Sequence, residues 1–245
     1  MIVEQLARRM AAQGPEADPS HPAQRPGRTE STGCPAGTAD RAINIRLATT
    51  DADLEAIYRF RYVIYVEEMH RQQKHADHAA RRICDPLDAC GHILGVWEQG
   101  EVVGTVRANF VRESDLGEYF EMYQVDRLPG EEQPRTSLTT RLMIHPRHRK
   151  GTLATRLARA IYRFGLERGI TTDLIDCNQH LIPFFTSLGY RVHRDDLVHP
   201  EYGAVTVMKL NLTDQAHLQQ IRSPFLPVLQ AWIAWQNQQN NHPNP

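Results

Sequence analysis

A short basic segment from Arg149 to Thr152 has the composition of an anion-binding turn. It separates a predicted strand, residues 137–146, from a predicted helix, residues 152–169. A strand that turns directly into a helix leaves several backbone N–H groups unpaired at the positive end of the helix dipole. Such a terminus binds phosphate groups readily. The segment therefore indicates a site for a phosphorylated co-substrate, with an ordinary basic turn as the alternative.

Two acidic and two basic side chains surround a predicted β-hairpin over residues 92–110. Asp85 and Asp88 come just before the hairpin. Arg107 lies in its second strand, and Arg141 lies in the next predicted strand. The carboxylates can bind an amine as an ammonium or accept its proton, and the guanidinium groups can clamp a carboxylate. Alternatively, the aspartates cap a turn and the arginines neutralise them.

The hydrophobic pattern places these residues in an alternation of strands and helices. Strands are predicted over 43–50, 92–110 as the hairpin, 137–146, 173–178, 190–194 and 204–212. Helices are predicted over 51–69, 113–126, 152–169, 180–189 and 214–239, the last of them interrupted. Thr50 or Asp51 is expected to cap the first helix. This order predicts an α/β (α+β) fold with a mixed, mainly antiparallel central sheet flanked by helices.

Composition excludes several classes of protein. Lys and Arg total 28 and Asp and Glu total 29, so bulk charge gives no reason to expect nucleic-acid or membrane binding. The four cysteines lack the spacing of a metal site, and no metal is expected. No segment approaches the roughly 20 apolar residues of a membrane span, and the first ten residues lack the apolar run of a signal peptide. We therefore expect a cytoplasmic protein without a membrane span, as a monomer or a homo-oligomer.

The chain divides into three predicted parts. Residues 1–41 are rich in Pro, Gly, Ser and Thr and are expected to form a flexible tail. Residues 42–212 are expected to form the main folded domain. Residues 213–245 are expected to form a helical extension and a polar tail.

The segment DCNQHLIPFFTSLGYR, residues 176–191, follows the anion-binding turn at a suitable distance. It places Asn178 at the end of a strand, before a short aromatic helix and a Leu-Gly-Tyr sequence. Together with the turn, this arrangement over about residues 43–210 resembles the GNAT superfamily of N-acyltransferases. The resemblance implies that the turn binds the pyrophosphate of coenzyme A or the phosphopantetheine arm. It also implies that two central strands splay apart to admit an acyl thioester.

Residues in the N-terminal half resemble a narrower branch, which contains bacterial N-acyl amino acid synthases and acyl-homoserine-lactone synthases. That branch carries an Arg with an aromatic residue four positions later, an Asp-x-x-Asp pair before the hairpin, an Arg within it and an Arg on the next strand. The matching residues are, in order, Arg61, Tyr65, Asp85, Asp88, Arg107 and Arg141. The resemblance implies an acyltransferase of the EC 2.3.1 type that acylates the primary amine of an amino acid or a related metabolite.

The expected mechanism is direct attack of the amine on the thioester, without a covalent enzyme intermediate. Backbone N–H groups near Met143 and Ile144 are expected to stabilise the oxyanion, and Asp85 and Asp88 are predicted to be catalytic. The predicted donor site consists of Met143, Ile144, Arg149, Lys150, Gly151, Thr152, Leu153, Ala154 and Asn178. The predicted substrate contacts are Arg61, Tyr65, Arg107, Arg141 and Phe185.

Two positions differ from the usual GNAT pattern. Thr152 stands where the turn has its middle glycine, and Phe185 stands where a tyrosine protonates the leaving thiolate. Because a phenyl ring cannot donate a proton, we expect Tyr190, Cys177 or a water molecule to do so.

These differences, and a basic helix face next to the turn, favour a donor that is attached to a macromolecule. The face consists of Arg156, Arg159, Arg163 and Arg168. An acyl carrier protein with a long acyl chain is the first choice, with acyl-CoA as the small-molecule form of the same thioester. No tightly bound cofactor is expected. An aminoacyl-tRNA donor is one alternative, and a non-catalytic module that binds an acyl ligand is an alternative of another class.

Overall fold

The computed structural model describes residues 42–241. The predicted tail, residues 1–41, and the last four residues, 242–245, lie outside the described residues. Among the helices of residues 42–241, none has the length and apolar composition needed to cross a bilayer.

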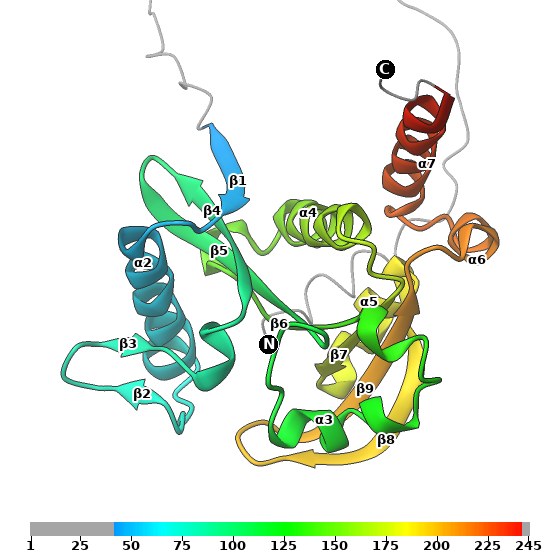
Figure 1. Ribbon diagram of the computed structural model, residues 1–245. Coiled ribbons are helices and arrows are strands. Elements are labelled where there is room, and N and C mark those ends of the chain that lie inside the picture. Colours follow the sequence, from blue (N-terminus) through cyan, green and yellow to red (C-terminus); the bar gives the residue numbers. More distant parts are fainter. Residues whose placement is uncertain (1–41, 242–245) are drawn as a thin grey trace, which may run out of the picture.

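A seven-stranded sheet forms the centre of the fold, in the order β1-β4-β5-β6-β7-β9-β8 (Figure 1). Its strands are β1 (Ile43–Leu47), β4 (His92–Glu98), β5 (Glu101–Phe110), β6 (Thr136–Ile144), β7 (Thr172–Cys177), β8 (Arg191–His199) and β9 (Gly203–Asn211). Within this sheet only β6 and β7 run parallel, and every other pair is antiparallel. The mixed, mainly antiparallel sheet that the sequence predicts is therefore confirmed.

Helices cover both faces of the sheet. They are α2 (Asp51–Tyr62), α3 (Glu118–Met122), α4 (Leu153–Glu167), α5 (Ile182–Leu188), α6 (Gln215–Gln220) and α7 (Leu226–Asn241). Packing places α2 and α3 against one face, whereas α4, α5 and the start of α7 pack against the other. A small second sheet, β2 (Ala76–Asp77) with β3 (Arg82–Ile83), lies beside α2 (Figure 1).

Local sequence explains where these helices begin and end. The side chain of Thr50 accepts a hydrogen bond from the N–H of Asp53 and caps α2, as one of the two predicted caps. The predicted helix over 51–69 changes after Tyr62 into a π-helical turn, Val63–Glu68. The helix predicted over 113–126 is reduced to α3, five residues long. The break predicted in the C-terminal helix separates α6 from α7.

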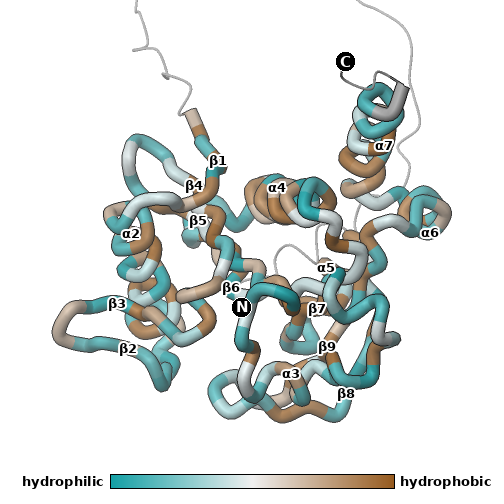
Figure 2. Tube along the Cα trace, viewed as in Figure 1, coloured by the Kyte–Doolittle hydropathy of each residue, from teal (hydrophilic) through white to brown (hydrophobic). Residues whose placement is uncertain are grey.

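The polar C-terminal part of helix α7 projects away from the rest of the domain (Figure 2). Its first turns are apolar and its later residues are hydrophilic (Figure 2). Leu229 is fully buried, and Trp232 packs against the same core as α4. Burial of this apolar segment therefore attaches the C-terminal extension to the sheet through α4.

Strands β6 and β7 pair only at their beginnings and then diverge. Thr136–Leu138 pair with Thr172–Leu174, but both strands continue beyond the paired segment. Between β5 and β6 the register shifts, so that Arg141 and Leu142 together face Val106. Arg141 has a left-handed φ of 59°. Such a bulge bends the strand and increases its twist, which accounts for the opening between β6 and β7.

A buried carboxylate, Asp173, lies at the closed end of this opening. It accepts hydrogen bonds from the hydroxyl groups of Ser137, Thr139 (2.8 Å) and Tyr190 (2.6 Å). Its burial nevertheless raises the pKa of the carboxyl to about 6, because the three hydrogen bonds offset only part of the desolvation. Ionised Asp173 is therefore a source of instability near neutral pH.

We expect Asp173→Asn to change how stability depends on pH. Folded Asp173 binds a proton more tightly than the unfolded chain does, so the wild type loses stability as pH rises from about 4 to about 6. The loss is on the order of 3 kcal/mol and is complete above pH 6. In urea titrations, the free energy of unfolding of the variant minus that of the wild type should therefore increase by this amount from pH 4 to pH 7. A difference between the two proteins that stays constant over this range would contradict the expectation.

Candidate active site

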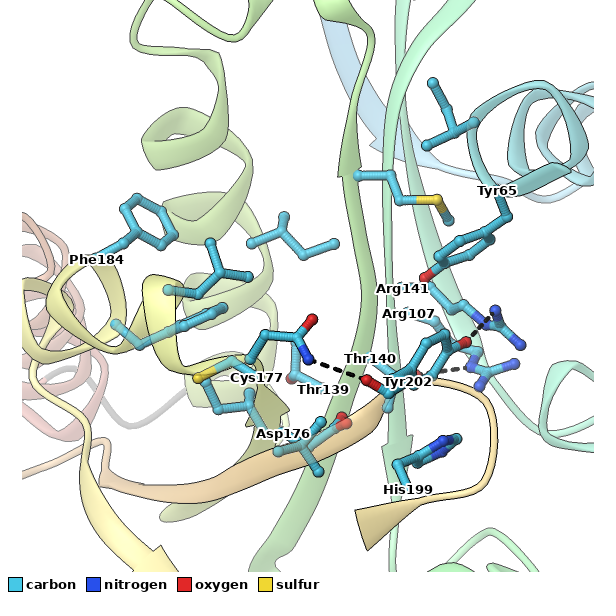
Figure 3. A pocket seen from close by; sticks show the side chains of 18 of the residues that line it. Tyr65, Arg107, Thr139, Thr140, Arg141, Asp176, Cys177, Phe184, His199 and Tyr202 are labelled. Carbon is cyan, nitrogen blue, oxygen red and sulfur yellow. Dashed lines mark hydrogen bonds between the residues drawn. The ribbon is translucent and has the colours of Figure 1, made fainter. Parts of the chain in front are cut away.

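A cavity of about 270 Å³ fills the opening between β6 and β7 (Figure 3). Its walls come from β5, β6, β7, α5, the π-helical turn after α2 and the β8–β9 hairpin. The side of the cavity toward α3 is polar and aromatic, and the side toward α4 and α5 is apolar. The divergence of the two strands thus joins the two faces of the sheet through one space.

Five charged side chains form a buried cluster beside the polar end. Arg61 Nη1 lies 2.7 Å from Asp88, and Arg107 Nη1 lies 2.5 Å from Asp85 and 2.7 Å from Asp88. Arg141 Nη2 lies 2.7 Å from Asp85. All five side chains are at most 6% exposed. The predicted motif residues are therefore brought together, as an ion-pair cluster.

Asp85 and Asp88 also cap the short helical turn Pro86–Asp88. The carboxylate of Asp85 accepts the N–H of Leu87 (3.1 Å), and the carboxylate of Asp88 accepts the N–H of Asp85 (2.8 Å). Burial opposes ionisation of Asp85, but Arg107 and Arg141 outweigh it and hold the pKa of its carboxyl well below its usual range.

Neither aspartate is among the residues that line the cavity. This corrects the expectation that Asp85 and Asp88 act on the amine, because their oxygens are already occupied by the arginines and by backbone N–H groups. The structure favours the alternative in which they cap a turn and pair with the arginines.

The cluster contains three arginines and only two aspartates, so one positive charge is not neutralised within it. Arg107 and Arg141 line the cavity, whereas Arg61 lies behind them and is fully buried. Nη2 of Arg107 makes no hydrogen bond to the residues that the structure describes. The cluster as a whole carries the surplus charge, and Arg107, whose side chain lines the cavity, can offer this donor to an anion at the polar end.

Arg141 is held in its bulged conformation from several sides. Its Nη1 donates to Gln73 and to the hydroxyl of Tyr202, each at 2.9 Å. The ring of Tyr65 lies 5.2 Å from its guanidinium carbon. These contacts stabilise a backbone conformation that non-glycine residues rarely adopt. The predicted substrate contacts Tyr65, Arg107 and Arg141 thus lie in the cavity wall.

Other residues at the polar end are not among those predicted from the sequence. Asp176 accepts a hydrogen bond of 2.5 Å from the hydroxyl of Tyr123. His199 stacks on Tyr202 with ring centroids 4.3 Å apart, and its Nδ1 accepts the N–H of Glu201. The sequence does contain a signal that Asp176 belongs to the site. Side chains two positions apart on a strand lie on the same side, so Asp176 shares a side with Asn178, a predicted site residue. No sequence signal connects the hairpin residues to the site.

Phe185 lies at the apolar end of the cavity. Neither of the two predicted proton donors, Cys177 and Tyr190, is suited to protonate the leaving thiolate. Burial raises the pKa of the Cys177 thiol to about 12, so this thiol is a weaker acid than an ordinary thiol, with a pKa of about 8.5. Tyr190 does not line the cavity, and its hydroxyl donates to Asp173. The structure corrects the expectation for Tyr190 because its proton is directed into the core, and it disfavours Cys177 as the acid.

The predicted anion-binding turn has two different parts. Arg149 is engaged, because it pairs with both oxygens of Glu68 and donates through Nε to the carbonyl of Ile144. Lys150, Gly151 and Thr152 are exposed, and no side chain caps α4. The N–H groups of its first turn, including those of Leu153 and Ala154, have no helical partner. Arg149 thus shapes the turn, and the backbone remains the predicted phosphate site.

The end of β6 directs one N–H group into the opening. The N–H of His145 donates to Val103 on β5, so alternation directs the N–H of Met143 toward β5 as well. The carbonyl of Ile144 faces the other way, toward Arg149. The N–H of Ile144 therefore faces the side from which β7 has diverged, and of the two predicted oxyanion donors it is the suitably directed one.

Known proteins resemble this chain in both sequence and fold. The family model described as N-acyl amino acid synthase FeeM matches residues 56–211. A search of curated proteins finds no match. FeeM itself, an N-acyl amino acid synthase from uncultured soil microbes, has a TM-score of 0.60 at 12% identity, covering 75% of this chain and 99% of that chain. The CoA-dependent acyl-homoserine lactone synthase MesI has a TM-score of 0.57 at 22% identity, covering 74% of this chain and 95% of that chain.

A putative N-acetyltransferase from Lactobacillus plantarum has a TM-score of 0.50 at 20% identity, covering 70% of this chain and 99% of that chain. At these identities the structural likenesses show the fold, and they confirm the predicted GNAT-like architecture. The family match covers more than half of the chain and confirms the predicted resemblance. The protein is an acyltransferase, and the chain belongs to the N-acyl amino acid synthase FeeM family.

Proposed function

We propose that the protein transfers an acyl group from a phosphopantetheine thioester to the amine of an amino acid whose carboxylate binds at Arg107 and Arg141. The observation that carries this proposal is the unneutralised positive charge of the arginine cluster at the polar end of the cavity. A carboxylate placed there would complete the charge balance of three arginines and gain a hydrogen bond from Arg107 Nη2.

The donor would reach this acceptor from the opposite face of the sheet. The apolar lining toward α4 and α5, which includes Leu142, Ile175 and Phe185, suits an acyl chain. The N–H of Ile144 faces the opening and would bind the carbonyl oxygen of the thioester. The uncapped first turn of α4 would hold the phosphates of the pantetheine arm.

We favour an acyl carrier protein over free acyl-CoA as the source of this thioester. Lys150, Arg156 and Arg159 are exposed beside the turn, where they would meet an acidic partner. Two acyl-homoserine lactone synthases of similar structure are described as CoA-dependent. Activity should therefore be tested with both acylated carrier protein and acyl-CoA.

The direct test is to incubate the purified protein with a panel of amino acids and either acylated carrier protein or acyl-CoA. The expected product is an N-acyl amino acid, identified by its intact mass. Absence of product with every pairing would contradict the proposal. Product formed only with charged tRNA, and abolished by ribonuclease, would contradict the thioester donor.

We expect Arg107→Lys to weaken binding of the acceptor. Lysine retains the charge that faces Asp85 and Asp88 but lacks the Nη2 donor, so KM for the amino acid should rise about 10- to 100-fold. An acceptor with an amidated carboxylate should show similar KM values for both proteins. Arg127→Lys is the matched control, because Arg127 is exposed and lies outside both the cavity lining and the basic helix face. Equal losses for the acid and the amide would contradict carboxylate binding at Arg107.

We expect Asp88→Asn to act on stability. Its carboxylate pairs with both Arg61 and Arg107 in a buried site, so loss of its charge leaves two arginines insufficiently paired. The free energy of unfolding should fall by about 3 kcal/mol or more in urea titrations. Asp195→Asn, at an exposed position, should change it by less than about 0.5 kcal/mol. Equal stability of the two variants would show that the cluster contributes nothing to folding.

A further inference from the structure

We infer that Asp176 binds the acceptor's amine as an ammonium and takes a proton from it. The inference rests on the proposed function and adds a residue to its site. Among the described residues that line the cavity, Asp176 is the single carboxylate. The other charged or ionisable cavity residues near the polar end are arginines, histidines and tyrosines, which do not neutralise an ammonium. An amine that enters the cavity as a cation therefore has one anionic partner among the described residues of this wall.

The position of Asp176 is fixed by a buried neighbour. The hydroxyl of Tyr123, which is fully buried, donates to Oδ1 at 2.5 Å. The other oxygen, Oδ2, accepts no hydrogen bond from the described part of the chain. Leu174, two residues earlier on β7, packs on the α3 side of the sheet, so Asp176 faces that side too. One oxygen is thus anchored and the other is available to a ligand.

Asp176 and the arginines form opposite poles of the same space (Figure 3). Arg141 binds the hydroxyl of Tyr202, and Tyr202 stacks on His199. His199 is within electrostatic range of both poles, since Asp176 favours its protonation and Arg141 opposes it. An α-amino acid carries an anionic and a cationic group on one carbon. A positive pole and a negative pole in one aromatic-walled cavity match that chemistry.

His199 is less suited to take the proton. Its Nδ1 accepts the N–H of Glu201, so the neutral ring carries its hydrogen on Nε2 and acts there as a donor. Burial lowers the pKa of His199, which keeps this neutral form at pH 7. Titratable groups in electrostatic contact with Asp176 include Tyr123 after α3, His199 at the end of β8 and Cys177 on β7.

The step is balanced with the groups named. The ammonium gives one proton to Oδ2 of Asp176, and the freed nitrogen lone pair forms a bond to the thioester carbonyl carbon. The C–S bond breaks and its electron pair leaves on sulfur. A second proton from the nitrogen passes to that thiolate, so an amide and a thiol result. Asp176 then returns its proton to solvent.

The test is Asp176→Asn, in which the amide oxygen still accepts from Tyr123 while the charge is lost. We expect kcat/KM for an amino acid to fall at least 100-fold at pH 7. The activity that remains should rise about tenfold per pH unit until the amine itself deprotonates. Methoxyamine is already neutral at pH 7, so both proteins should acylate it at rates within about threefold, after subtraction of the uncatalysed reaction. Asp195→Asn is the matched control and should behave as the wild type.

A binding measurement separates this inference from the proposed function. By calorimetry, the wild type should bind L-phenylalanine more tightly than 3-phenylpropanoate, which lacks the amine, and Asp176→Asn should lose that preference. Loss of preference in a protein that acylates no amine would overturn the proposed function and support the ammonium site. Wild-type kinetics, pH profile and binding preference in Asp176→Asn, in a protein that does acylate amino acids, would overturn the inference alone.

Discussion

The buried contact between three arginines and two aspartates is the interaction on which the arrangement of the site depends. Each charge loses its hydration on folding, and the loss is offset only if the partners meet with good geometry. Arg61 comes from α2, Arg107 from β5 and Arg141 from β6, while both aspartates come from one capped turn. The cluster therefore fixes the relative positions of a helix, a turn and two strands at one end of the cavity.

The same cluster connects local backbone geometry with the shape of the sheet. Arg141 adopts a left-handed conformation at the bulge of β6, and its guanidinium is held by Asp85, Gln73 and Tyr202. The bulge bends β6 beyond its short parallel pairing with β7. The opening that results joins a polar, aromatic face with an apolar one. For the proposed pair of an acyl donor and a charged amino-acid acceptor, such a junction would let the two substrates meet at one carbonyl carbon.

Several side chains that could take part in catalysis instead stabilise the folded structure. Asp85 and Asp88 cap a turn and neutralise arginines, Arg149 ties the turn before α4 to Glu68, and Tyr190 donates its proton to Asp173. In each case a buried or half-buried polar group has found a partner inside the protein, as desolvation demands. Asp176 differs, since it lines the cavity and only one of its oxygens is anchored by Tyr123 among the described residues.

The sequence by itself determined the order of the main strands and helices, the hairpin and the turn before α4, because these depend on periodicity, turn residues and spacing over short stretches. The family followed from the resemblance of its motif residues to known acyltransferases. The sequence also identified Tyr65, Arg107 and Arg141 through a motif with fixed order. Only the tertiary structure decided what the motif residues contact and which other residues complete the site. Asp176, His199 and Tyr202 reach the cavity through the pairing of β7 with β9 and the course of the β8–β9 hairpin. Tyr202 lies 61 positions from Arg141 in the chain, and no local pattern encodes a contact over that separation.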